Sequence, residues 1–230
     1  MSDLPDDEIF ENVDALARML TLLSPRQRER LVNGALTDRH GAQRGIRALS
    51  TQVVHLDTAQ RSRLVKASIE SLETWTPESL GAETRHLDET ERRSLIAAAM
   101  SITDDSCKAG VMSSLASGMP SFNPLERERI METAIGIRNE DGRATAINAI
   151  AAEHMAHLNT TQRALLVEST VRIEDAYARA RALSGLARAM KHLDDTQRYR
   201  IFEEINNIAD EIDAALALNG LCQAMPHLSS

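Results

Sequence analysis

One six-residue tract recurs along the chain, and this repetition limits the possible folds more than any other feature. Each copy begins with Leu or Phe, continues with Ser, Asp or Asn, and ends in Arg; the copies begin at residues 23, 56, 87, 122, 158 and 193. Neighbouring copies are 31 to 36 residues apart. A fixed period of this size is typical of proteins built from stacked helical units.

The tract itself predicts the start of a helix. Its Ser, Asp or Asn is followed three residues later by Gln or Glu in all six copies. This spacing is that of a capping box, in which each of the two side chains accepts a hydrogen bond from the backbone N–H of the other residue. Pro25 and Pro124 stand at the first helical position, where the missing N–H costs nothing. Six such boxes at one period predict six equivalent helices.

Two apolar patterns follow each tract. The first, seen in Leu166, Thr170 and Ile173, has helical spacing and predicts a helix that we call helix A. A short acidic turn such as Asp104-Asp105 follows in several repeats, where the dipole of the next helix favours negative charge. The second pattern predicts helix B and is formed by Ile46, Leu49 and Val53; Met112, Leu115 and Met119; Leu183, Leu186 and Met190; and Leu218, Leu221 and Met225.

These patterns predict an all-α fold, a right-handed-type α-solenoid of about six tandem helix A/helix B hairpins. Residues 5–22 are expected to supply an N-terminal capping helix. A single hairpin cannot bury its apolar stripe, whereas stacked hairpins share a continuous core. Since no linker rich in Pro, Gly or Ser divides the chain, residues 1–230 are expected to form one helical-repeat domain.

Composition limits the core and the partners. Aromatic residues make up 3% of the chain, so the core must be built mainly from Leu, Ile, Ala and Met. The net charge of −8 disfavours a nucleic acid partner, because an acidic chain repels phosphates. Cys107 and Cys222 lie in apolar helical contexts and are predicted to be buried thiols in a reducing compartment.

We expect a cytoplasmic protein with no membrane partner, because the chain has no apolar signal-peptide region and no apolar run of spanning length. Secretion by a route without such a signal stays open.

The repeat organisation resembles the α-solenoid superfamily of HEAT, armadillo and tetratricopeptide arrays over nearly the whole chain. The tract Leu23-Ser24-Pro25-Arg26-Gln27 is also similar to the start of transcription-activator-like effector repeats. Those repeats contact DNA through a Gly-rich loop, whereas the corresponding loop here is acidic, so DNA binding is not carried over. The organisation is also similar to that of other helical-repeat effectors of plant-associated bacteria. The resemblance implies a binding protein.

No catalytic site, metal site or cofactor is predicted, because the common nucleophile, zinc-protease and phosphate-binding motifs are missing from the sequence. Five histidines precede the Leu that opens the next tract: His55, His86, His157, His192 and His227. A shared metal would need their nitrogens about 2.0–2.1 Å from one ion, yet equivalent positions of neighbouring hairpins lie roughly 8–10 Å apart. We therefore interpret these histidines as helix-end residues.

The Arg that ends the tract recurs as Arg28, Arg61, Arg92, Arg127, Arg163 and Arg198. One hypothesis is a cationic ladder for an acidic partner. The other, which we favour, is a clamp between neighbouring repeats, because scaffold residues recur while binding residues vary.

A shortened repeat is the first candidate for a partner site. Its helix B is cut to about residues 77–85, and Trp75 stands at the break. A missing turn predicts a notch, and Trp is enriched at interface hot spots. The simpler interpretation, which we favour, is that Trp75 fills the gap in its own repeat.

Basic residues on helix B form the second candidate. They are Arg44, Arg47, Lys108, Arg143, Arg179, Arg181, Arg188 and Lys191. Inner helices of solenoids line the concave surface, so an acidic peptide segment, or less readily an RNA backbone, could bind there. An ordinary solvated face is the simpler alternative.

The expected function is a protein–protein interaction scaffold or adaptor, with a bacterial effector as one form of it, that binds a partner along the helix-B face. The alternative is a helical-repeat protein that binds nucleic acid, either RNA or DNA. The residues predicted to contact the partner are Trp75, Arg44, Arg47, Arg143, Arg181, Arg188 and Lys191.

Overall fold

The computed structural model describes residues 13–37, 42–71, 80–81 and 83–224, and these residues contain helices and no β-strand. The predicted all-α class is therefore confirmed for this part of the chain. None of the helices in it has the length and apolar character needed to span a membrane.

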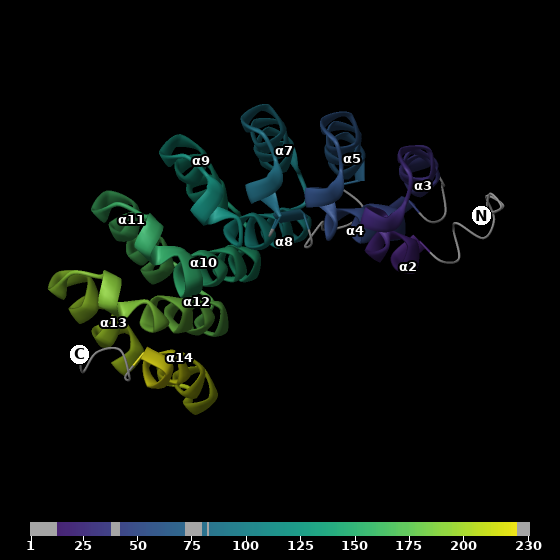
Figure 1. Cartoon of the computed structure of the whole chain (residues 1–230). Coiled ribbons are helices and arrows are strands. Elements are labelled where there is room, and N and C mark those ends of the chain that lie inside the picture. Colours follow the sequence, from purple (N-terminus) through teal and green to yellow (C-terminus); the bar gives the residue numbers. More distant parts are fainter. Residues whose placement is uncertain (1–12, 38–41, 72–79, 82, 225–230) are drawn as a thin grey trace.

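Two sets of helices alternate along the chain (Figure 1). The outer helices, which follow the recurring tracts, are α3 (Pro25–Thr37), α5 (Thr58–Ser71), α7 (Glu89–Ser101), α9 (Pro124–Ile135), α11 (Thr160–Val171) and α13 (Asp195–Asn206). The inner helices are α2 (Val13–Arg18), α4 (Ala42–Ser50), α8 (Asp105–Ala116), α10 (Glu140–His154), α12 (Ala176–Arg188) and α14 (Glu211–Ala224). The outer helices lie along the convex side of an arc and the inner helices along its concave side.

All six predicted capping boxes are formed. At α7 the side chain of Asp88 accepts from the N–H of Glu91, and the Glu91 carboxylate accepts from the N–H of Asp88. The same reciprocal bonds begin α3, α5, α9, α11 and α13. Each outer helix therefore begins where the sequence places it, with two of its free N–H groups satisfied.

A 3-10 helix directly precedes each of the six tracts, which the sequence patterns did not predict. These turns are Leu20–Leu22, Val53–His55, Thr84–His86, Met119–Ser121, Met155–His157 and Met190–His192. The prediction that Val53, Met119 and Met190 end an α-helix is therefore wrong, and so is the extension of the short helix B through Arg85. These three apolar side chains are nevertheless buried, so the core gains the same residue from a tighter turn.

The predicted apolar sets form the core, with exceptions on α14. Leu166, Thr170 and Ile173 are fully buried, as are the described helix-B positions of the earlier repeats. Leu218 is 46% exposed, although its pattern predicts burial. The prediction of buried thiols is also wrong, because Cys222 is exposed and Cys107 is only partly buried. Leu218 and Cys222 lie on one face of α14. On α8, α10 and α12, the equivalent face is covered by the inner helix that follows.

Inner helices approach one another through small residues. A Cβ atom at Gly185 would lie 2.7 Å from Asn148 Oδ1, and one at Gly220 would lie 2.2 Å from the Ser184 carbonyl oxygen. Only glycine allows this approach between α12 and its neighbours α10 and α14. The inner row is therefore held by close packing of small residues.

Four of the six recurring arginines contact the following repeat, as the structural interpretation predicted: Arg28, Arg61, Arg92 and Arg163. Arg28 donates to the Leu20 carbonyl at 3.1 Å and to the His55 carbonyl of the next repeat at 3.2 Å. Arg163 donates in the same way to Met155 and to His192. These guanidinium groups satisfy carbonyls of the 3-10 turns, which leaves fewer of their N–H donors for a partner.

Candidate functional site

The most distinctive surface group lies where α10 and α12 begin, on the inner row. Arg181 of α12 donates to the Asp141 carboxylate of α10, with 2.6 Å between Nη2 and Oδ1, and also to the Asp141 carbonyl. The Arg181 guanidinium lies over the ring of Tyr177, 5.8 Å from its centroid. We call Asp141, Tyr177 and Arg181 the inner cluster. Tyr177 is 51% exposed, so the inner cluster offers an aromatic surface on a helix.

Hydrogen bonds fix the helix turn that holds Tyr177. Asp175 caps α12 by accepting from the N–H of Ala178 at 2.7 Å. Glu140, in the preceding repeat, accepts from the N–H groups of Asp175 at 2.7 Å and Glu174 at 3.1 Å. These backbone hydrogen bonds, aided by the nearby Arg143, lower the pKa of Glu140 below its ordinary value. The Glu140 carboxylate thus holds the start of α12 against α10, and the Asp175 carboxylate caps α12 itself.

The predicted basic face is largely engaged within the chain. Arg143 is half-buried and donates to the Ile137 carbonyl at 3.3 Å and to Glu140 at 2.9 Å. Arg188 donates to Asn148 Oδ1 at 2.7 Å. The structure therefore places Arg181 and Arg188 in contacts between α12 and α10, whereas the contacts of Arg143 are with its own helix and the residue Ile137 before it.

Arg44 and Arg47 are not brought together with these residues. Arg44 and Arg47 are exposed on α4, well along the arc from α12 (Figure 1). Lys191 is exposed but lies in the 3-10 turn Met190–His192, so its assignment to helix B is wrong. Trp75 and most of the shortened helix B lie outside the described residues.

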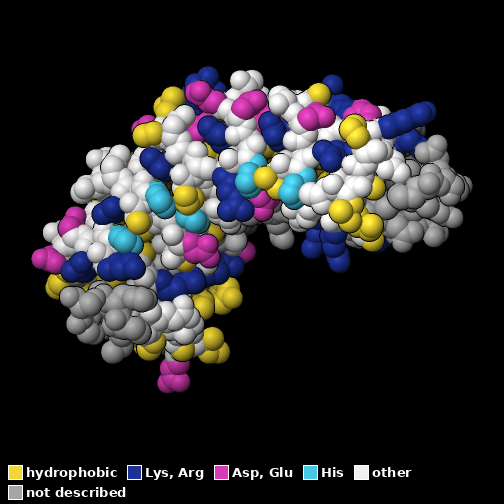
Figure 2. Space-filling model, in the orientation of Figure 1, with side chains coloured by type: hydrophobic (Ala, Val, Ile, Leu, Met, Phe, Trp, Pro, Cys, Tyr) yellow, Lys and Arg dark blue, Asp and Glu magenta, His cyan; other side chains and the backbone are white. Residues whose placement is uncertain are grey.

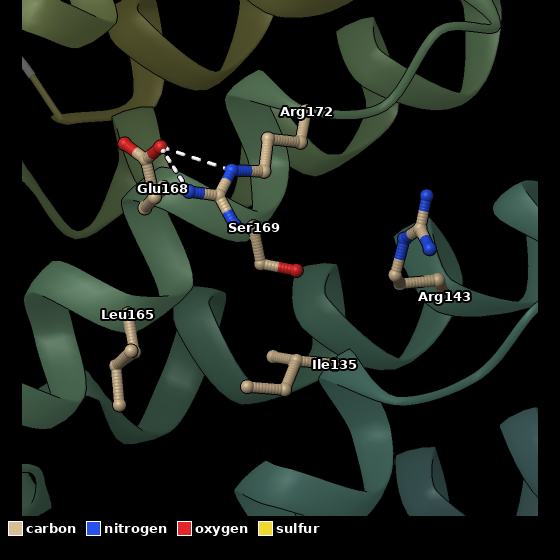
Figure 3. Close-up of a pocket in the computed structure, with 6 residues that line it drawn as sticks. All are labelled: Ile135, Arg143, Leu165, Glu168, Ser169 and Arg172. Carbon is tan, nitrogen blue, oxygen red and sulfur yellow. Dashed lines mark hydrogen bonds and ion pairs between the residues drawn. The ribbon is translucent and has the colours of Figure 1, made fainter.

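Sequence reasoning missed a groove between outer helices. It has a volume of about 300 Å³ and is lined by Ile135, Arg143, Leu165, Glu168, Ser169 and Arg172 (Figure 3). A groove of about 290 Å³ lies at the matching positions of α3 and α5, lined by Asn33, Leu36, Arg63, Lys66, Ala67 and Glu70. An ion pair lies at the rim of each groove, but its charges stand in the opposite order along the helix. The pair is Lys66–Glu70 on α5 and Glu168–Arg172 beside the groove of α9 and α11. Both grooves are shallow gaps between neighbouring helices, and the only signal for them is the repeat period.

Histidines form a row across one face of the arc (Figure 2). His55, His86, His157 and His192 each end a 3-10 turn. His154 is buried, and its ring lies 6.2 Å from that of His157. Burial lowers the pKa of His154, more than the nearby Glu153 raises it. Among the residues that the structure describes, no three His, Cys, Asp or Glu side chains lie close enough together to hold a metal ion.

No protein-family model, curated protein or solved structure matches this chain significantly.

Proposed function

We propose that the protein is a right-handed-type α-solenoid of about six hairpins with an N-terminal capping helix, and that it binds another protein through its inner helices. The observation that carries this proposal is the exposed ring of Tyr177 beneath the guanidinium of Arg181. Tyr and Arg are among the residues that dominate interface energetics. The inner cluster is therefore proposed as the anchor of the binding surface.

The inner cluster is ordered before a partner arrives. Arg181 is held by Asp141, and the helix turn that bears Tyr177 is held by Asp175 and Glu140. Side chains that are already fixed lose little conformational entropy on binding. A partner that places an apolar group on the ring and a carboxylate near Arg181 would gain from both contacts.

An acidic segment of a protein fits this surface better than a nucleic acid does. Arg44 and Arg47 are exposed on α4, and Arg143 and Arg181 are each paired with an acid of the same chain. Either anion would compete with Glu140 and Asp141 for these arginines, but a phosphate backbone needs cations along its whole length and is repelled more strongly by a chain of net charge −8. A single acidic segment of a protein can instead bind to only part of the surface formed by the inner helices.

The test compares two variants that make the same chemical change on opposite sides of the arc. Tyr177→Ala/Arg181→Glu alters the inner cluster. Tyr199→Ala/Arg200→Glu alters an exposed pair on the outer helix α13 and serves as the matched control. Both variants are first checked for wild-type helicity by circular dichroism. Proteins captured from lysate are identified, and the affinity of the purified partner is then measured.

We expect the inner variant to weaken binding at least tenfold and the outer variant to leave it unchanged. Equal retention by both variants would place the binding surface elsewhere. If the captured material is sensitive to nuclease and its binding falls steeply with salt, the nucleic acid alternative replaces this proposal.

A further inference from the structure

The contact between α10 and α12 has two matching parts. Gly185 and Arg188 of α12 both meet Asn148 of α10: the backbones approach closely at Gly185, and Arg188 Nη2 donates to Asn148 Oδ1 at 2.7 Å. The donor part is the sequence Gly185-Leu-Ala-Arg188, and the acceptor part is Ile147-Asn-Ala-Ile150. A helix with a small residue and an Arg one turn later therefore fits a helix with an Asn on its facing side.

The donor part occurs a second time, in α2. The sequence Ala15-Leu-Ala-Arg18 differs from Gly185-Leu-Ala-Arg188 only in its first residue, which is small in both. Both sequences end their inner helix and stand one residue before a 3-10 turn, at Leu20 and at Met190. Ala15 and Arg18, which correspond to the residues of α12 that face α10, are both exposed on α2.

The acceptor part also occurs a second time, in α14. The sequence Leu218-Asn-Gly-Leu221 corresponds to Ile147-Asn-Ala-Ile150. On α10 the face is covered by α12, and Ile147 is fully buried. On α14 the equivalent Leu218 is 46% exposed, and Asn219 is exposed as well.

These two residue types do not occur at the matching positions of the other described inner helices. The Arg188 position is occupied by Thr51 and Ser117 directly after α4 and α8, and by Ala152 and Gln223 in α10 and α14. The Asn148 position is occupied by Arg47, Ser113 and Ser184 in α4, α8 and α12. Arg18 and Asn219 are thus an equivalent pair whose members stand at opposite ends of the arc (Figure 1).

We propose that copies of this chain associate head to tail, with Ala15 and Arg18 of α2 in one copy docked on Leu218 and Asn219 of α14 in the next. The contact continues the inner row from one copy to another in the register of the α10–α12 contact, with the backbones farther apart because Ala15 carries a Cβ where α12 has Gly185. Such a contact joins two different surfaces, so repeated addition gives an open chain or a closed ring instead of a simple twofold dimer.

The test uses two variants, each altered at one of these faces. Ala15→Glu/Arg18→Glu changes only the α2 face, and Asn219→Glu changes only the α14 face. All three positions are exposed, so we expect both variants to keep the wild-type circular dichroism spectrum. Sedimentation velocity is measured on the full chain at concentrations up to about 1 mM, so that weak association is also populated.

We expect the wild type to form species larger than a dimer as its concentration rises, and each variant alone to remain at the mass of one chain. An equimolar mixture of the two variants should form a dimer and nothing larger. The intact α14 face of one variant can bind the intact α2 face of the other, and no further pair of intact faces remains. A wild type that stays at the mass of one chain throughout would overturn the proposal. So would self-association of the α2-face variant alone, which would indicate contact between two α14 faces.

Discussion

Arg188 and Asn148 lie on consecutive inner helices, 40 residues apart in sequence, and are joined by a hydrogen bond of 2.7 Å between Nη2 and Oδ1. Both side chains are partly buried at the place where Gly185 brings the two backbones together. A hydrogen bond from a charged donor at such a position contributes to the register of the two helices as well as to stability.

The first prediction concerns this bond. Arg188→Met keeps most of the apolar stem but removes the donor, and Asn148→Ala removes the acceptor. We expect each change to lower the free energy of unfolding by about 1–2 kcal/mol. The double variant should lose less than the sum of the two, with a coupling of about 1 kcal/mol in a double-mutant cycle measured by urea denaturation. Additive losses would show that the two side chains do not stabilise each other.

The second prediction compares two glycines of the inner row. A Cβ at Gly185 would meet Asn148 atoms at 2.7 to 2.9 Å, whereas the nearest atoms to a Cβ at Gly142 lie at 3.2 to 3.3 Å. Gly185→Ala should therefore cost about 2–3 kcal/mol through overpacking. Gly142→Ala should change stability by less than about 1 kcal/mol, because its smaller clash is offset by higher helix propensity. Thermal and urea denaturation of the two variants show which one loses more stability. Equal losses would contradict the close approach at Gly185.

The third prediction tests a capping box. Asn159→Ala removes the side chain that accepts from the N–H of Gln162 at 2.9 Å. Loss of an N-cap costs about 1 kcal/mol. Thr160→Ala changes the next residue, which is exposed, and serves as the control. A control variant as unstable as Asn159→Ala, measured by the same urea denaturation, would show that the loss does not come from the cap.

The fourth prediction concerns pH and Glu140. Hydrogen bonds from the N–H groups of Asp175 and Glu174 keep the pKa of Glu140 below its ordinary value of 4.5 in the folded chain. Because the folded pKa is lower than the unfolded one, the carboxylate stabilises the fold above pH 4.5, and this contribution is lost as the pH falls through the folded pKa. Glu140→Gln should therefore be less stable than the wild type at pH 7.

The difference between Glu140→Gln and the wild type should shrink as the pH falls below 4.5. Asp104 also has a lowered pKa, because its carboxylate accepts from the N–H of Cys107, so both proteins keep some pH dependence. The quantity to measure is thus the difference between their unfolding free energies at each pH. A difference that is constant from pH 7 to pH 3 would rule out this role of Glu140.

The sequence by itself determined the local structure. Capping boxes such as Asp88–Glu91 are satisfied within four residues, so they can be found without tertiary contacts. The apolar spacing of Leu166 and Thr170 likewise placed them correctly in the core. The same spacing could not distinguish the last turn of an α-helix from a 3-10 turn, because their periods of 3.6 and 3.0 differ little over one turn.

Only the tertiary structure decided how charges and surfaces are used. The sequence predicted Arg143, Arg181 and Arg188 as a face for a partner, but their acceptors include Asp141 and Asn148, which the fold brings across from another helix. It did not single out Tyr177 as a surface residue, because exposure depends on the neighbouring helices. Leu218 has the same local pattern as Leu183, yet one is exposed and the other buried. Burial is a property of the stack, since each inner helix is covered by the next one, whereas capping and periodicity belong to the segment itself.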